Sequence, residues 1–128
     1  MTVTFEVHGR PAPQGSKTIM RGRLVESSKY LPAWRKAIAE AATEIQAETE
    51  WFSEAPLVME VSFTLTKPKT VKRDLPTVPP DLDKLARAIG DSCTGILYND
   101  DAQIVRLILS KEYGATEGAV VTISEYNN

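Results

Sequence analysis

The chain has few of the residues that build covalent cross-links or soft-metal sites. Its 128 residues include one cysteine, Cys93, and one histidine, His8. A single cysteine excludes an internal disulfide framework and a cysteine-rich zinc site. It fits a reduced, cytoplasmic setting, because disulfides belong to oxidising compartments.

Long apolar runs are absent as well. A membrane-spanning helix needs about 20 mainly apolar residues, and the sequence has no such stretch. The N-terminus lacks a basic start followed by an apolar segment, so no signal peptide is expected. Hydrophobic residues make up 42% and charged residues 25%, which is typical of a globular chain. We therefore expect a single domain over residues 1–128, with no membrane partner.

Net charge is small, at −2, but it is unevenly distributed. Basic residues dominate segments 8–36 and 67–90, and acidic residues dominate segments 37–66 and 91–128. A near-neutral total therefore leaves room for a basic surface beside a group of carboxylates. Ordinary solvated charge is the alternative explanation for the same pattern.

Hydrophobic periodicity predicts an α+β fold in the order β-hairpin-α-β-α-β-β. Alternating residues predict strands and helical spacing predicts two helices, the first from Leu31 to about Glu50 and the second from Asp81 to Thr94. Between the fourth strand and the second helix lies a loop, residues 67–80, with four prolines and four bases, which we expect to be mobile. The expected strands are 2–9, a hairpin within 17–27 around Arg21-Gly22, 57–66, 101–113 and 118–126. Two helices on a mixed or antiparallel sheet would make one compact unit.

Aspartate is rare except in one segment, residues 79–105. Five of the six aspartates lie there, without a single glutamate: Asp81, Asp83, Asp91, Asp100 and Asp101. If the chain turns back tightly after the second helix, the turn at 98–101 would lie near the first helical turn. Three or four carboxylates would then converge, and they would repel one another unless a cation neutralised them.

Mg²⁺, or Mn²⁺ in its place, is the cation that such oxygen ligands favour. We expect the ion at Asp81, Asp83, Asp100 and Asp101, where it would support phosphoryl chemistry. Asp91 is expected to be a surface or capping residue, because helical rise puts it about 12 Å from Asp83. Taken singly, each pair has a structural explanation: Asp81 can cap the helix, and Asp100-Asp101 can form a turn.

Cations flank the acidic segment. Arg87 follows Asp83 by four residues, so it could stabilise charge on a phosphate, pair with Asp83 along the helix, or do both. Further bases in the hairpin, the loop and the second helix are candidate DNA contacts: Lys17, Arg21, Arg23, Lys67, Lys69, Lys72, Arg73 and Lys84.

The stretch PPDLDKLARAIGDSCTGILYNDDAQI resembles the signature of RusA-type Holliday junction resolvases, small crossover-junction endodeoxyribonucleases common in phages and prophages. The opening GRPAPQGSK is also similar to the family's, and the likeness covers nearly the whole chain. The family pattern places its acids at Asp81, Asp83 and Asp101. It places its catalytic base-type residue, usually Lys, at Arg87. Lys84 stands where the family often has Asn.

The resemblance implies a Mg²⁺-dependent homodimer that binds four-way DNA junctions and nicks two opposed strands symmetrically, in DNA recombination and repair. It implies no organic cofactor, and a phage or prophage gene acting in the cytoplasm of a bacterial host. Arg87 keeps the family's positive charge but does not lose its proton at working pH. If the family residue transfers a proton, either Lys84 takes over that step or no residue does.

Two other classes of function fit parts of the pattern. A different metal-dependent phosphoryl hydrolase could use Asp-x-Asp, but the haloacid-dehalogenase type needs a buried strand directly before it, where this chain has Pro79-Pro80. A non-catalytic DNA-binding protein could use the acids only as caps and turns. It predicts that Asp83→Asn changes little, whereas a nuclease would lose cleavage.

Overall fold

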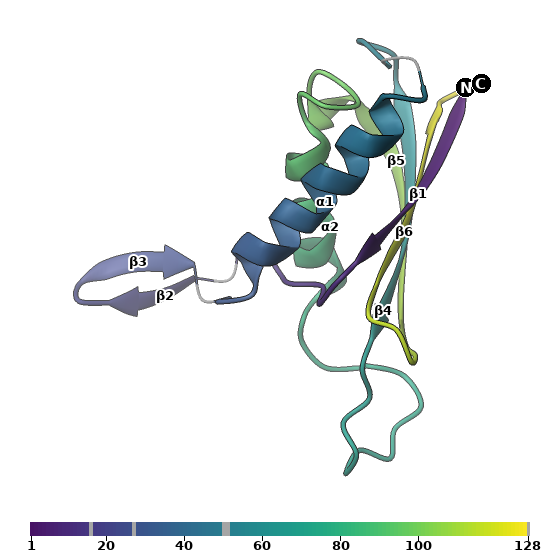
Figure 1. Cartoon of the computed structure of the whole chain (residues 1–128). Helices are drawn as coiled ribbons and strands as arrows, with labels where there is room; N and C mark the ends of the chain where they lie inside the picture. The colour runs from purple at the N-terminus through teal and green to yellow at the C-terminus, as the bar shows by residue number, and fades with distance from the viewer. Residues whose placement is uncertain (16, 27, 50–51, 128) are drawn as a thin grey trace.

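The computed structural model describes residues 1–15, 17–26, 28–49 and 52–127. A four-stranded sheet carries both long helices on one face, and a two-stranded hairpin projects from the body (Figure 1). This confirms the expected α+β class and the expected order of elements. None of the helices in the described part of the chain combines the length and apolarity that crossing a membrane requires.

The sheet is mixed, and its strand order is not the order of the sequence. The strands run in the order β1-β6-β4-β5, so β6 lies inside the sheet between β1 and β4. β6 is antiparallel to both of these neighbours, whereas β4 and β5 are parallel. The four strands are β1 (Thr2–His8), β4 (Leu57–Leu65), β5 (Ile104–Tyr113) and β6 (Gly118–Glu125).

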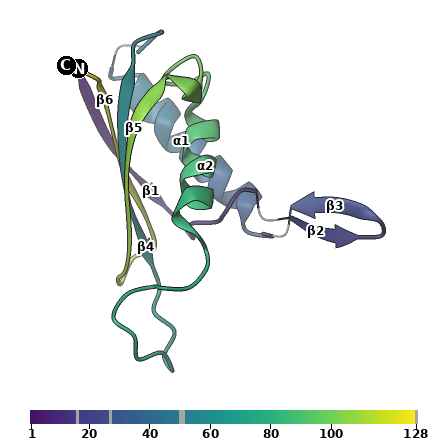
Figure 2. The same ribbon diagram turned by 180° about the vertical axis from the view of Figure 1, so that it is seen from behind.

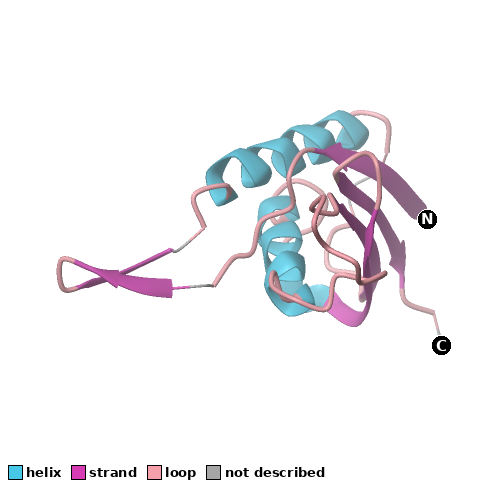
Figure 3. Ribbon diagram, turned by 90° about the horizontal axis from the view of Figure 1, so that it is seen from below, coloured by secondary structure: helices cyan, strands magenta, loops and turns pink. Residues whose placement is uncertain are grey.

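Strict alternation along the strands builds the core. In β1, every second residue from Val3 to Val7 is buried and the residues between are exposed. The buried face is covered by α1 (Leu31–Gln46) and α2 (Leu82–Cys93), which lie on the same side of the sheet (Figure 3). Cys93 belongs to this core, where burial raises the pKa of its thiol to about 12 and keeps it protonated.

The first helix is shorter than its periodicity predicts. It ends at Gln46 rather than near Glu50, and Glu50 itself lies outside the described residues. The backbone N–H groups of Glu48 and Thr49 donate to carbonyls only three residues back, so the helix ends in tight turns. The glutamates near the C-terminal end of α1 repel the negative end of its dipole, and the last turn has no basic residue to offset this repulsion. Extension of the helix beyond Gln46 is therefore disfavoured.

The predicted hairpin is confirmed as β2 (Lys17–Met20) and β3 (Arg23–Glu26). Arg21 and Gly22 both have positive φ, at 52° and 76°, which is the backbone of a two-residue hairpin turn. The hairpin extends well away from the sheet and helices (Figure 2).

A parallel crossover joins β4 to β5 and carries all of the clustered aspartates. Residues 66–81 form a long loop, α2 runs back along the sheet, and a turn leads into β5. The end of this loop is fixed, because Lys111 Nζ donates to the carbonyls of Val78 and Pro80, each at 2.9 Å. Mobility of residues 67–80 stays a prediction. β5 begins at Ile104, three residues later than expected, since Asp101–Gln103 form a short 3₁₀ helix.

Tyr98 anchors the turn between α2 and β5, which leads to a stability prediction. Its ring is fully buried and its hydroxyl donates to the carbonyl of Gly90 at 2.8 Å. We expect Tyr98→Phe to lower the free energy of unfolding by roughly 1 kcal/mol, because the ring stays and one buried hydrogen bond is lost. Urea denaturation measures this. The control is Tyr126→Phe, at a side chain 38% exposed, and equal stability of the two variants would contradict the prediction.

Candidate active site

The N-terminal end of α2 presents two aspartates to solvent. Asp81 occupies the N-cap position with an extended backbone, as predicted, but its side chain makes no capping hydrogen bond. Asp83 lies in the first helical turn, and both side chains are exposed. The positive end of the helix dipole favours negative charge at this end of α2.

Asp101 is held at the other end of the helix. Asp100 caps the 3₁₀ helix, since its Oδ1 accepts from the backbone N–H of Ala102 at 2.9 Å. The Gln103 side chain accepts from the backbone N–H of Asp100 at the same distance, which completes a capping box. This cap fixes the backbone at Asp101. A side chain added at Gly90 would place its Cβ 3.4 Å from Oδ2 of Asp101, so the carboxylate lies directly against the helix.

The Asp101 carboxyl group has a raised pKa. Partial burial is the largest cause, and hydrogen bonds and charges from Asp91 and Asp100 add to it. Asp91 is half-buried beside Asp101, so the expectation of a surface or capping residue is wrong. Three carboxyl groups crowded at this end of α2 leave negative charge that a cation would stabilise.

A hollow of about 390 Å³ joins the two ends of the helix. Asp83, Arg87 and Asp101 line it together, over an apolar floor from β4 and β5 that includes Met59 and Leu107. Asp81 does not line this hollow; it faces a separate, larger cleft together with Lys84. The structure therefore brings together three of the four residues that the sequence pattern singles out for catalysis.

The tight convergence expected at the first turn of α2 is not observed. Asp101 lies beside Gly90, which helical rise puts about 10 Å from Asp83. The reason is the parallel pairing of β4 and β5: β5 starts where β4 starts, and α2 has by then run the length of the sheet. Across residues 1–15, 17–26, 28–49 and 52–127, no three His, Cys, Asp or Glu side chains come together in a group that could hold a metal ion.

The turn after β1 completes the site from outside the acidic segment. A Cβ at Gly15 would lie 3.2 Å from Cζ of Arg87 and would overlap its Nη1, so the guanidinium packs against the Gly15 backbone. Next to it, Gln14 donates through Nε2 to Oδ2 of Asp91, and its backbone N–H donates to the carbonyl of Lys84 at 3.0 Å. This turn therefore contacts both a cation and an acid of α2.

Gln14, Gly15 and Asp91 are site residues that the sequence patterns missed. The one signal for the first two was the segment GRPAPQGSK, whose likeness to the RusA opening gave no role to individual residues. No local pattern shows that a turn near residue 15 packs on a helix more than 65 residues later.

The predicted DNA-contacting bases fall in three places, the hairpin, the loop after β4 and α2, where half-buried Lys84 lines the larger cleft. Arg21 is exposed at the tip of the hairpin, while the side chains of Lys17 and Arg23 lie outside what the structure describes. In the loop, Lys67, Lys69 and Lys72 are exposed. Arg73 is half-buried, and its Nε donates to the hydroxyl of Tyr113 at 2.9 Å.

Comparison with known proteins agrees with this arrangement. The family model for "Endodeoxyribonuclease RusA" matches residues 7–124, a span that includes the Gln14 turn, α2 and the Asp100-Asp101 turn. The chain belongs to the RusA family. RusA is a family of endodeoxyribonucleases, and membership implies nuclease activity of the Holliday junction resolvase type.

A relative supports the same extent of similarity. The chain is 28% identical over 141 aligned residues to "Uncharacterized protein YqaN" of Bacillus subtilis (strain 168), with 96% of both chains covered. Both this relative and the RusA family model therefore match nearly the whole of the sequence.

Proposed function

We propose that this protein is a metal-dependent endonuclease that resolves four-way DNA junctions by cutting two opposed strands. The observation that carries the proposal is the hollow in which Asp83, Arg87 and Asp101 meet, inside a chain matched by the RusA family over residues 7–124. Two acids and a fixed cation beside an open surface suit the hydrolysis of a phosphodiester.

The carboxylates around the hollow are of the chemical type that Mg²⁺ or Mn²⁺ binds, although no three of them are preassembled as a metal site among the described residues. Mg²⁺ uses one or two carboxylates and keeps several waters, so it does not need a closed protein cage. Asp83 and Asp101 both line the hollow but are separated by about 10 Å of helical rise, so they would hold one ion together only if binding drew them closer; Asp81 and Asp100 would be further oxygen donors at its two ends. Partial burial is the largest cause of the raised pKa of Asp101, and the neighbouring Asp91 and Asp100 add to it, so a bound cation would stabilise its charged form. When bound, the metal would polarise the phosphate and activate water.

Arg87 supplies fixed positive charge to the same hollow. Its guanidinium packs against Gly15, and from there it would stabilise charge that develops on the phosphate. Arg87 would replace the family's usual Lys if that residue acts only by its charge; if it transfers a proton, Lys84 would have to take over that step or the step would be lost.

Lysine and arginine side chains from two segments, on either side of the acidic hollow, would bind the DNA backbone. The projecting hairpin carries Lys17, Arg21 and Arg23, and the loop after β4 carries Lys67, Lys69 and Lys72. Phosphate contacts of this kind position nucleic acid without reading its sequence.

Symmetric cutting of two strands requires two sites, so we propose a homodimer with one site in each subunit. The family likeness supports a phage or prophage gene whose product acts in the host cytoplasm during DNA recombination and repair. No organic cofactor is needed for this chemistry.

A cleavage assay on a synthetic four-way junction tests the proposed function. Paired symmetric nicks are expected with Mg²⁺ or Mn²⁺ and none with EDTA, while linear duplex of the same sequence is spared. Junction binding without cleavage in either metal would contradict the nuclease proposal and favour a non-catalytic DNA-binding protein. Cleavage of duplex and junction at equal rates would favour a different phosphoryl hydrolase.

A further inference from the structure

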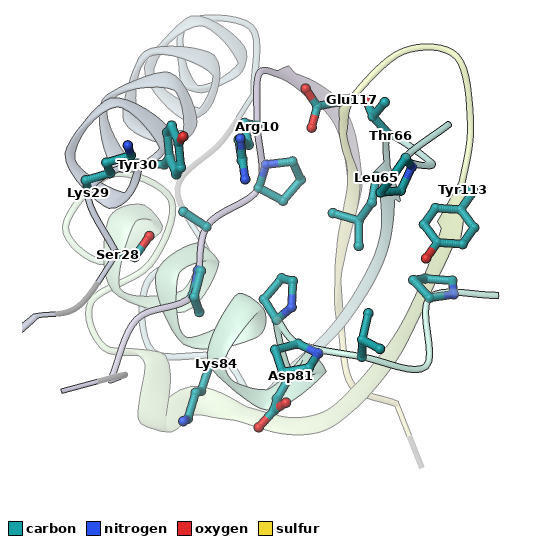
Figure 4. A pocket seen from close by; sticks show the side chains of 18 of the residues that line it. Arg10, Ser28, Lys29, Tyr30, Leu65, Thr66, Asp81, Lys84, Tyr113 and Glu117 are labelled. Atoms are coloured by element: carbon teal, nitrogen blue, oxygen red, sulfur yellow. The ribbon is translucent and has the colours of Figure 1, made fainter. Parts of the chain in front are cut away.

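A large cleft lies on the other side of α2 from the acidic hollow. It has a volume of about 960 Å³ and is enclosed by the turn after β1, the start of α1, the loop after β4 and the start of α2. Figure 4 shows Arg10 and Tyr30 on one side of it, Tyr113 on the other, and Asp81 and Lys84 along the first turn of α2.

The first turn of α2 separates the cleft from the hollow. Asp81 and Lys84 line the cleft, whereas Asp83 and Arg87 line the hollow. Residues next to each other in a helix point to different sides of it. The cleft and the hollow therefore share the first turn of α2 as a common wall and are adjacent. A strand whose phosphate lay at the hollow would therefore place a neighbouring nucleotide at the cleft.

The walls of the cleft are suited to a flat apolar ring. Leu65 and Val78 line it, together with six prolines: Pro11, Pro13, Pro68, Pro76, Pro79 and Pro80. Rigid proline rings lose little conformational entropy when a ligand packs on them. Nucleobase faces stack on such apolar and aromatic surfaces regardless of sequence.

The rim of the cleft is cationic. Four bases face two acids, with Arg10, Lys29, Arg73 and Lys84 against Asp81 and Glu117. Tyrosines hold two of the cations in place. Cζ of Arg10 lies 3.8 Å from the ring centroid of Tyr30, and Arg73 donates to the hydroxyl of Tyr113. Cations positioned in this way attract a phosphate without first losing side-chain freedom.

We propose that this cleft takes one unpaired nucleotide from the branch point of the junction. The base would lie against the proline-lined wall and its phosphate against Arg10 and Lys84. A volume of about 960 Å³ falls in the range of small-molecule sites and is far too small for a duplex. This inference rests on the proposed junction substrate and adds a reason for preferring it, because base pairs at a branch point are easier to open than those within a duplex.

The experiment uses a junction carrying 2-aminopurine at one branch-point position, in EDTA so that no strand is cut. The 2-aminopurine fluorescence is expected to rise when the protein binds, because the base leaves its stack, and no rise is expected on duplex. Val78→Trp fills the cleft and is expected to abolish the rise and to weaken junction binding about tenfold, the effect of losing one stacked base. Leu75→Trp is the matched control in the same loop: Leu75 is 58% exposed and does not line the cleft.

A second pair of variants avoids dependence on one bulky substitution. Arg10→Ala is expected to reduce the fluorescence rise and junction affinity, whereas Arg35→Ala, at an exposed position on α1, leaves both unchanged. Replacing the branch nucleotide by an abasic site, which keeps the phosphate, is expected to remove the difference between wild type and Val78→Trp.

Three results would overturn the inference. The first is a junction that is bound in EDTA without any rise in fluorescence but is cut when Mg²⁺ is supplied in a separate assay, which would leave the proposed function standing. The second is a normal rise with Val78→Trp. The third is an abasic junction bound as tightly as the intact one, which would mean that the cleft holds phosphate alone. A protein that does not bind the junction would overturn both this inference and the proposed function.

Discussion

Asp101→Asn is expected to leave junction binding intact and to reduce metal-dependent cleavage at least about a hundredfold, because even residues that only support metal ligands cost 10–100-fold. The amide keeps the shape of the carboxylate but loses its charge. The variant is also expected to be at least as stable as wild type, because partial burial and then the neighbouring Asp91 and Asp100 raise the pKa of Asp101, so its charged form is unfavourable in the folded state. Single-turnover cleavage, gel-shift titration and thermal unfolding measure the three quantities.

Two companion variants define the site more closely. Asp83→Asn is expected to match Asp101→Asn, because both side chains line the same hollow, while Asp81→Asn is expected to lose less activity because Asp81 faces the neighbouring cleft. Asp74→Asn, at an exposed loop position, is the control and should cut at the wild-type rate. Full activity in Asp101→Asn would mean that the acids act only as caps and turns.

Gly15→Ala is expected to lower the cleavage rate about tenfold to a hundredfold with little change in junction affinity, since small displacements of a catalytic group can cost that much. The new Cβ would overlap Nη1 of Arg87 and force the guanidinium away from its place in the hollow. Gly15 also has a φ of 99°, which disfavours alanine, so some loss of stability is expected as well.

Gly22→Ala separates the steric effect from backbone strain. Gly22 has a similar φ of 76°, but a Cβ there would meet nothing within 4 Å, so stability falls and the cleavage rate does not. A double-mutant cycle with Arg87→Ala gives the decisive comparison. If Gly15 acts through Arg87, Gly15→Ala has no further effect on cleavage once the guanidinium is removed; additive losses would contradict this explanation.

Local sequence patterns predicted the elements of this fold, because each pattern is set by one element's own buried face. The alternation from Leu57 to Leu65 gave β4, and the apolar stripe from Leu82 to Cys93 gave α2. Strand pairing is different, since periodicity says nothing about which strands become neighbours. The parallel pairing of β4 with β5 was therefore missed, and with it the position of Asp101 beside Gly90.

The candidate site likewise combines residues that local patterns predict with residues that only tertiary contacts reveal. Asp83, Arg87 and Asp101 were predicted from their residue types and spacing, and all three line one hollow, while their catalytic roles stay predictions. Gln14 and Gly15 act through contacts with a helix distant in the chain, and neither contact leaves a local pattern. The half-burial of Asp91 also depends on that tertiary packing.

The interior position of β6 has a consequence for how the protein folds in the cell. Among the strands of the described residues β6 comes last in the sequence, yet it lies between β1 and β4 and joins them. Synthesis delivers the N-terminal segments first, so β1 waits without its sheet partner until residues 118–125 have left the ribosome. The core under α1 and α2 then closes in one late step, dominated by contacts between distant segments, which are slow to form. An incomplete chain would thus expose an open sheet to chaperones and proteases and would have no working nuclease surface.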